Sequence, residues 1–293
     1  MLKITWFRGD YQQQQEVCGM NDARLCCEGF EPGDFLVFYS DLPYAWVKLA
    51  DEITESLVYF HQKEFRFVLP LDYQTRKGFA PGLFERKQEI KLWAPSQKEL
   101  QAYYNLAYNP SDQHLAWEMT NPAAEKYGNP IHSMAVKADA IAAFPHAFAN
   151  RVTRNEGEFF ARNAIDGMSV PGGHGPYPYQ SWGGAVHNDL SFVVYFGREV
   201  QADKIVLHLR SDYSVNQEGK EHDTYWHTAL ISFSDGSEME VSLEKKAEGQ
   251  EIKFPAKKIT WVMLKRLDPF QNPNSQMFAA LNQMEVWGTN VKI

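Results

Sequence analysis

Polar side chains that could do chemistry are concentrated in one stretch of the second half of the sequence. Arg210 ends a run of alternating apolar residues, Asp212 follows it, and His222, Asp223 and His227 come shortly afterwards. Histidine and aspartate can ligate metals, and all of these groups can hydrogen-bond a polar ligand. The stretch is therefore a candidate metal centre or a candidate rim of a binding site.

The spacing does not favour a transition-metal centre. His222 and His227 are five residues apart on a segment predicted to be extended, so their side chains point to opposite faces. The sequence also has no HExxH pattern. Alternation places His227 on the apolar face of a predicted strand. The remaining residues could bind hydroxyl groups, and a surface salt bridge between Arg210 and Asp212 is the alternative interpretation.

A second set of candidates lies in the segment SVPGGHGPYPYQSWGG, residues 169–184. Its glycines and prolines exclude a regular element, so His174, Tyr177 and Tyr179 are predicted to be displayed on a loop at one end of a scaffold, where binding sites are common. Trp182 is expected in the core instead. The glycines are no phosphate-binding loop, because no GK[ST] follows them.

The elements that must position these residues are predicted to be strands. Short apolar and aromatic runs punctuated by Gly, Pro, Asn and Asp are typical of antiparallel sheets, and helical periodicity is scarce. We predict an all-β fold with strands at 34–40, 44–50, 55–62, 65–71, 89–95, 190–197, 204–210, 225–234, 238–244, 251–255, 259–267 and 282–288. Asp235-Gly236 is a hairpin signal, and Ser96 could cap a short helix.

The length of 293 residues favours two domains. We predict an N-terminal β-sandwich over residues 1–120, a connector rich in proline and small residues over 121–134, and a jelly-roll β-sandwich over 135–293.

Three segments of the second half resemble a known family. They are TRNEGEFFARNAIDG (153–167), SWGGAVHNDLSFVVYFGREVQADKIVLHLR (181–210) and LNQMEVWG (281–288). In order and spacing they resemble the discoidin or coagulation-factor C-type domains of the galactose-binding-domain-like superfamily, over about residues 135–290. The resemblance implies a galactose-binding-like jelly roll and leaves the ligand open, because one fold hosts many functions. The N-terminal third resembles no family that we recognise.

The resemblance also implies a structural calcium ion, with Asp166 of the AIDG turn and Glu285 of the closing strand as ligands. Calcium needs six to eight oxygen ligands, and Met168 stands where relatives often carry an acidic or polar residue. The alternative is that Asp166 caps its own turn and Glu285 pairs with a neighbouring side chain.

Composition narrows the class of partner. A formal net charge of -8 and a pI near 5.6 argue against nucleic acid and against an anionic membrane surface. No signal-peptide core and no apolar run of membrane-spanning length is visible, so we expect a cytoplasmic protein. The three cysteines, all within residues 18–27, fit a reducing compartment.

We therefore expect a non-catalytic carbohydrate-binding protein. Tyr177 and Tyr179 would stack on a sugar ring, while the other candidates, His174, Arg210, Asp212, His222 and Asp223, would bind its hydroxyl groups. Weak binding of one sugar would make a homo-oligomer useful. Two alternatives stay open. One is a carbohydrate-active, glycoside hydrolase-like enzyme with its site between the two domains, for which Asp212 and Asp223 are a candidate pair, and the other is a structural or protein-interaction module.

Overall fold

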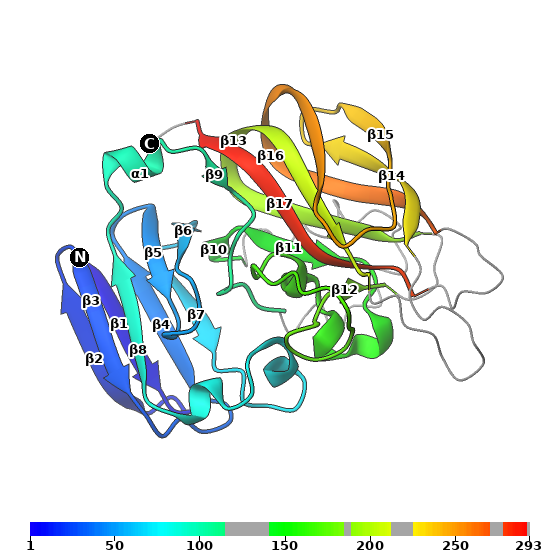
Figure 1. Ribbon diagram of the computed structural model, residues 1–293. Coiled ribbons are helices and arrows are strands. Elements are labelled where there is room, and N and C mark those ends of the chain that lie inside the picture. The colour runs from blue at the N-terminus through cyan, green and yellow to red at the C-terminus, as the bar shows by residue number, and fades with distance from the viewer. Residues whose placement is uncertain (115–140, 185–188, 212–224, 270–277, 292–293) are drawn as a thin grey trace.

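The computed structural model describes residues 1–114, 141–184, 189–211, 225–269 and 278–291, and these form a nearly all-β fold (Figure 1). The predicted fold class is confirmed. The predicted connector lies outside the described residues, so the domain boundaries stay a prediction. No helix in the described ranges is long and apolar enough to span a bilayer.

Two antiparallel sheets make up the N-terminal half. Their strands are β1 (Leu2–Phe7), β2 (Gln13–Gly19), β3 (Asp22–Cys27), β4 (Phe35–Ser40), β5 (Tyr44–Lys48), β6 (Ser56–Phe60), β7 (Glu64–Val68) and β8 (Gln88–Trp93). One sheet has the order β2-β1-β4-β7 and the other β10-β6-β5-β8-β3, where β10 (Ala143–Phe144) comes from further along the chain. Alternate residues of both sheets, such as Ile4, Phe38 and Leu92, meet in one buried core.

Three short helical elements complete this half. The 3-10 turns η1 (Thr75–Gly78) and η2 (Leu83–Glu85) lie between β7 and β8. The helix α1 (Gln97–Leu100) begins at Ser96, whose hydroxyl accepts a hydrogen bond from the backbone N–H of Glu99 while the Glu99 carboxylate accepts one from Ser96. The predicted cap is confirmed.

A larger sheet makes up the C-terminal half. Its strands are β9 (Tyr104–Asn105), β11 (His146–Ala149), β12 (Trp182–Gly183), β13 (Ser191–Leu209), β14 (Trp226–Phe233), β15 (Glu238–Ser242), β16 (Gln250–Pro269) and β17 (Ala280–Asn290). The order is β12-β17-β13-β16-β14-β15, with β11 beside β13 and β9 beside β17. Before β12 come three more 3-10 turns, η4 (Thr153–Asn155), η5 (Gly157–Phe159) and η6 (Ala161–Ala164).

Strand β13 joins two predicted strands into one, and a bulge allows it to serve two parts of the core. Phe192, Val194 and Ala202 are buried in its first part, but beyond the register shift between Ala202 and Lys204 the buried residues are Ile205, Leu207 and Leu209. An extra residue in one strand reverses which face points inward and bends the strand. Together with β16, which is one residue longer, β13 forms the jelly-roll sandwich around the main core of this half.

A similar irregularity corrects the expectation for His227. Between Trp226 and Thr228 the pairing of β14 with β16 shifts register. Trp226 is therefore buried, His227 is exposed, and the inward alternation resumes at Ala229. The hairpin at Asp235-Gly236 is present as predicted, with Gly236 at φ 84.

The two halves are joined by a buried polar segment, residues 109–112. The Asn109 side chain donates to the carbonyl of Pro145 at 2.8 Å and accepts from the backbone N–H of Ser111 at 3.1 Å, while its own N–H donates to the carbonyl of Ile165 at 2.9 Å. From the C-terminal half, Arg162 donates to the carbonyls of Pro110 and Asp112 at 3.2 and 2.8 Å. These contacts satisfy polar groups that would otherwise be buried unpaired.

We predict that Asn109→Ala lowers the free energy of unfolding by about 2–4 kcal/mol, because the Pro145 carbonyl and the Ser111 N–H lose a buried partner. The matched control is Asn21→Ala at an exposed position, for which a change below about 0.5 kcal/mol is expected. Urea unfolding followed by tryptophan fluorescence measures both. Equal effects of the two substitutions would contradict the role of Asn109.

Candidate functional site

The loop of residues 169–184, which carries the aromatic candidates Tyr177 and Tyr179, packs against the N-terminal half. The backbone N–H of Tyr177 donates to the carbonyl of Lys77 in η1 at 2.8 Å, and the Lys77 ammonium lies 2.7 Å from the Glu158 carboxylate. Close approach of the two halves here requires Gly157, because a Cβ at that position would lie 1.8 Å from the carbonyl oxygen of Gln74. The loop is therefore bonded to η1 through Tyr177, and the neighbouring residues Gly157 and Glu158 hold the C-terminal half against the same region by close backbone contact and by charge.

This contact encloses two neighbouring cavities of about 320 and 400 Å³. Four residues line both of them: Phe79, Ala80, Leu83 and Tyr177. We call the pair of cavities the Tyr177 cleft. Both volumes fall in the range of small-ligand sites, and the cleft lies between the two halves of the protein, a common place for such sites.

One end of the cleft, the 320 Å³ cavity, has a polar group of side chains in its wall. It is lined by Arg162, Asp166 and Gln180, all buried. The Gln180 amide donates to Asp166 Oδ2 at 2.9 Å, and the Arg162 guanidinium lies 3.6 Å from the same oxygen. Among the described residues, Gln180 Oε1 has no hydrogen-bond donor. This end therefore offers a buried acceptor that the described protein atoms leave unsatisfied.

The other end, the 400 Å³ cavity, has an aromatic wall. Tyr73 is 65% exposed there, with the Lys77 ammonium 4.7 Å and the Arg76 guanidinium 5.5 Å from its ring centroid. Tyr177 is half-buried between this end and the polar end. An aromatic ring beside donors and acceptors is suited to a ligand with both apolar and polar faces.

The structure places the predicted ligand-binding residues in different surroundings. Tyr177 lines the cleft, whereas the ring of Tyr179 packs against Gly173 and His174 is exposed elsewhere on the loop. Arg210 is 4% exposed and donates to the carbonyl of Phe278 at 3.2 Å, so it does not join Tyr177 in the cleft. The other predicted ligand-binding residues, Asp212, His222 and Asp223, lie outside the described residues.

The two predicted calcium ligands are surrounded by hydrogen-bond donors. Asp166 accepts from the backbone N–H of Met168 at 2.9 Å as well as from Gln180. Glu285 is bonded to the indole N–H of Trp287 at 2.6 Å, and its other oxygen lies 3.2 Å from His208 Nε2. The His208 contact lowers the pKa of Glu285.

These surroundings do not fit the all-oxygen shell that calcium requires. Within the described ranges, no group of three or more His, Cys, Asp or Glu side chains could hold a metal ion. Calcium binding therefore stays a prediction from the resemblance, and no role in the site is assigned to it.

Several residues of the cleft were missed from the sequence. Arg162 precedes Asp166 by four residues in ARNAIDG, a spacing that could have suggested the pair, but nothing marked Gln180. Tyr73 and Phe79 come from the N-terminal half, and no sequence pattern indicated that this half meets the loop.

Asp166 gives the site a pH-dependent stability. Burial raises the pKa of Asp166 from 3.8 to about 6, against the opposing effect of Arg162. Since the raised pKa belongs to the folded state, the cost of ionising Asp166 is absent below about pH 4, grows between pH 4 and 6, and is complete above that range.

We predict that the free energy of unfolding of Asp166→Asn, relative to the original protein, rises by about 3 kcal/mol between pH 4 and pH 7. Asp235→Asn is the control with the opposite sign, because the hydrogen bond from Ser237 lowers the pKa of Asp235. Urea unfolding at several pH values tests this, and parallel curves for Asp166→Asn and the original protein would refute it.

Comparisons with known proteins were made at three levels. No protein-family model matches the sequence, and no curated protein matches it significantly. Solved structures do match in part. One is a labelled variant of chitosan-binding module 1 from a Paenibacillus sp. IK-5 chitosanase/glucanase, at 15% identity and a TM-score of 0.36, covering 64% of this chain and 100% of that one.

Two further matches are sugar-binding domains solved in complex with a sugar. The family 32 carbohydrate-binding module of C. perfringens NanJ, solved with galactose, is 16% identical with a TM-score of 0.35, covering 48% of this chain and 91% of that one. A histidine mutant of the lectin binding domain of lectinolysin, complexed with Lewis b, is 16% identical with a TM-score of 0.35, covering 50% of this chain and 92% of that one.

Proposed function

We propose that this protein binds a carbohydrate non-catalytically in the Tyr177 cleft. The observation that carries the proposal is the position of Tyr177, whose half-buried ring stands between a polar cavity and an aromatic one. Pyranose rings present an apolar C–H face and a rim of hydroxyl groups. A site that combines an aromatic ring with buried hydrogen-bonding groups is complementary to both.

The polar end supports discrimination between sugars. A hydroxyl group that reaches the base of the 320 Å³ cavity could donate to Gln180 Oε1, the acceptor that lacks a donor among the described residues. Arg162 and Asp166 beside it are fixed by their contacts with the backbone and with each other. A ligand lacking that hydroxyl would leave a buried polar atom unpaired, which is the strongest source of selectivity in such sites.

The two cavities together favour a ligand longer than one sugar ring. Each has room for a compact ring, and they share Tyr177 as a common wall. A di- or trisaccharide could therefore place one ring beside Arg162 and another beside Tyr73. His174 and Tyr179 stay outside this version of the site.

The alternative function is that of a glycoside hydrolase-like enzyme, in which carboxylates would hydrolyse the bound sugar. Burial raises the pKa of Asp166 as it would that of a proton donor, but both of its oxygens are occupied by contacts with Met168, Gln180 and Arg162. The proposal is therefore recognition without hydrolysis, and release of reducing sugar from a bound glycan would overturn that part of it.

We predict that Tyr177→Ala weakens the binding of a neutral oligosaccharide, first identified on a glycan array, by roughly tenfold or more. Tyr177→Phe keeps the ring and should bind nearly as the original protein does. Tyr39→Ala, on the N-terminal sheet and away from both cavities, is the matched control and should leave binding unchanged. Isothermal titration calorimetry measures all four proteins, and unchanged binding by Tyr177→Ala would remove the cleft as the site.

A further inference from the structure

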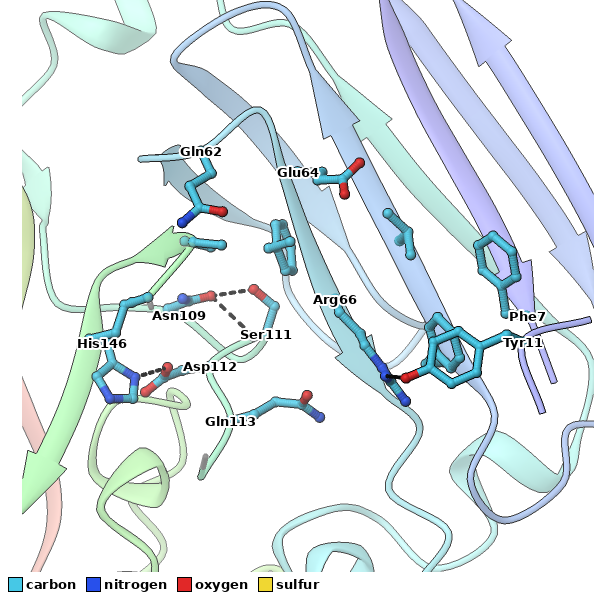
Figure 2. Close-up of a pocket in the computed structure, with 16 residues that line it drawn as sticks. Phe7, Tyr11, Gln62, Glu64, Arg66, Asn109, Ser111, Asp112, Gln113 and His146 are labelled. Atoms are coloured by element: carbon cyan, nitrogen blue, oxygen red, sulfur yellow. Dashed lines mark hydrogen bonds and ion pairs between the residues drawn. The ribbon is translucent and has the colours of Figure 1, made fainter. Parts of the chain in front are cut away.

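A third cavity, of about 510 Å³, lies at the outer face of the sheet β2-β1-β4-β7, against the segment 109–113 and β11 (Figure 2). Its apolar lining includes Phe7, Phe35, Val37 and Ile141. Its charged groups on the sheet are Glu64 and Arg66, which lie two residues apart on β7 and face the same way, since the residue between them, Phe65, is buried in the core. This cavity is separate from the Tyr177 cleft, with which it shares no lining residue.

Arg66 is held in place by aromatic contacts. Its guanidinium lies 3.6 Å from the ring centroid of Phe35 and donates to the hydroxyl of Tyr11 at 3.0 Å, as Figure 2 shows. Among the described residues, Arg66 has no carboxylate partner. A stacked guanidinium keeps a planar set of N–H donors available for a carboxylate, which it binds through two parallel hydrogen bonds.

Glu64 complements Arg66. Its side chain is exposed at the cavity, and it has no hydrogen-bond or ion-pair partner within the described part of the chain. The Cα atoms of residues two apart on a strand are separated by roughly 7 Å. A ligand that carries both a carboxylate and an ammonium group can therefore reach Arg66 with one group and Glu64 with the other.

The opposite wall is fixed. Asp112 Oδ1 lies 2.7 Å from His146 Nδ1, and Asp112 Oδ2 accepts from the N–H of Ala147 at 2.9 Å (Figure 2). Gln113 exchanges hydrogen bonds of 2.9 and 2.6 Å with the backbone of Val68 and so extends the edge of β7. Both Asp112 oxygens are used inside the wall, which leaves Glu64 and Arg66 as the charged pair that faces a ligand.

From this arrangement we infer a second binding site, for a free amino acid with an apolar side chain. Its carboxylate pairs with Arg66, its ammonium group pairs with Glu64, and its side chain packs against the apolar lining near Phe7 and Val37. A ligand that carries only a negative or only a positive charge would pair with only one of the two residues. The site does not depend on the carbohydrate proposal.

The test uses L-phenylalanine and two derivatives, N-acetyl-L-phenylalanine, which lacks the ammonium group, and L-phenylalaninamide, which lacks the carboxylate. We predict that L-phenylalanine binds and that each derivative binds at least tenfold more weakly. Arg66→Gln and Glu64→Gln should each weaken the binding of L-phenylalanine by tenfold or more. Glu64→Gln should also reduce the preference of the protein for L-phenylalanine over the N-acetyl derivative.

Asn21→Ala, at an exposed position outside the cavity lining, is the matched control, and it should bind L-phenylalanine like the original protein. Binding is measured by calorimetry or ligand-observed NMR with the full chain, and circular dichroism checks that each variant is folded. Absence of L-phenylalanine binding at millimolar concentration overturns the inference, as does equal binding of the three compounds or of Arg66→Gln.

Discussion

Burial of the polar segment 109–112 between two hydrophobic cores is the constraint on which the rest of the structure depends. Polar backbone groups inside a protein must find partners, and here Asn109 and Arg162 supply them. Because those partners come from both halves, satisfying the segment also fixes one half against the other. The 320 Å³ cavity, with Arg162 and Pro110 in its wall, and the 510 Å³ cavity, with Asn109 in its wall, both lie beside this segment.

The same constraint accounts for the composition of the candidate site. The loop 169–180 does not project freely from the sandwich, because the backbone N–H of Tyr177 donates to the carbonyl of Lys77. Its aromatic residue thus becomes one wall of a cleft whose other wall is η1, η2 and Tyr73. The N-terminal half, which resembles no recognised family, is in this account half of the binding site.

Features encoded by residues close together in the sequence could be predicted, whereas features that depend on distant segments could not. Alternation with clear turns identified β4 to β8, and the Ser96 cap followed from neighbouring residues. β2 was missed because its polar run QQQEVCG is largely exposed, and His227 was placed inward because a bulge cannot be read from alternation. Arg210 was expected at a rim, yet its position next to β17 buries it. Gln180 and the partners of Tyr177 depend on contacts between distant segments, which no local pattern encodes.

The central claim is that a sugar sits between Arg162 and Tyr73, against Tyr177. An NMR titration of the isotope-labelled full chain with the oligosaccharide tests it most directly. The account predicts that the largest shifts occur at the Gln180 side-chain amide and at the backbone N–H groups of Met168 and Tyr177, with saturation at one stoichiometric ligand. Shifts confined to residues 210–227, with Gln180 and Tyr177 unmoved, would contradict it.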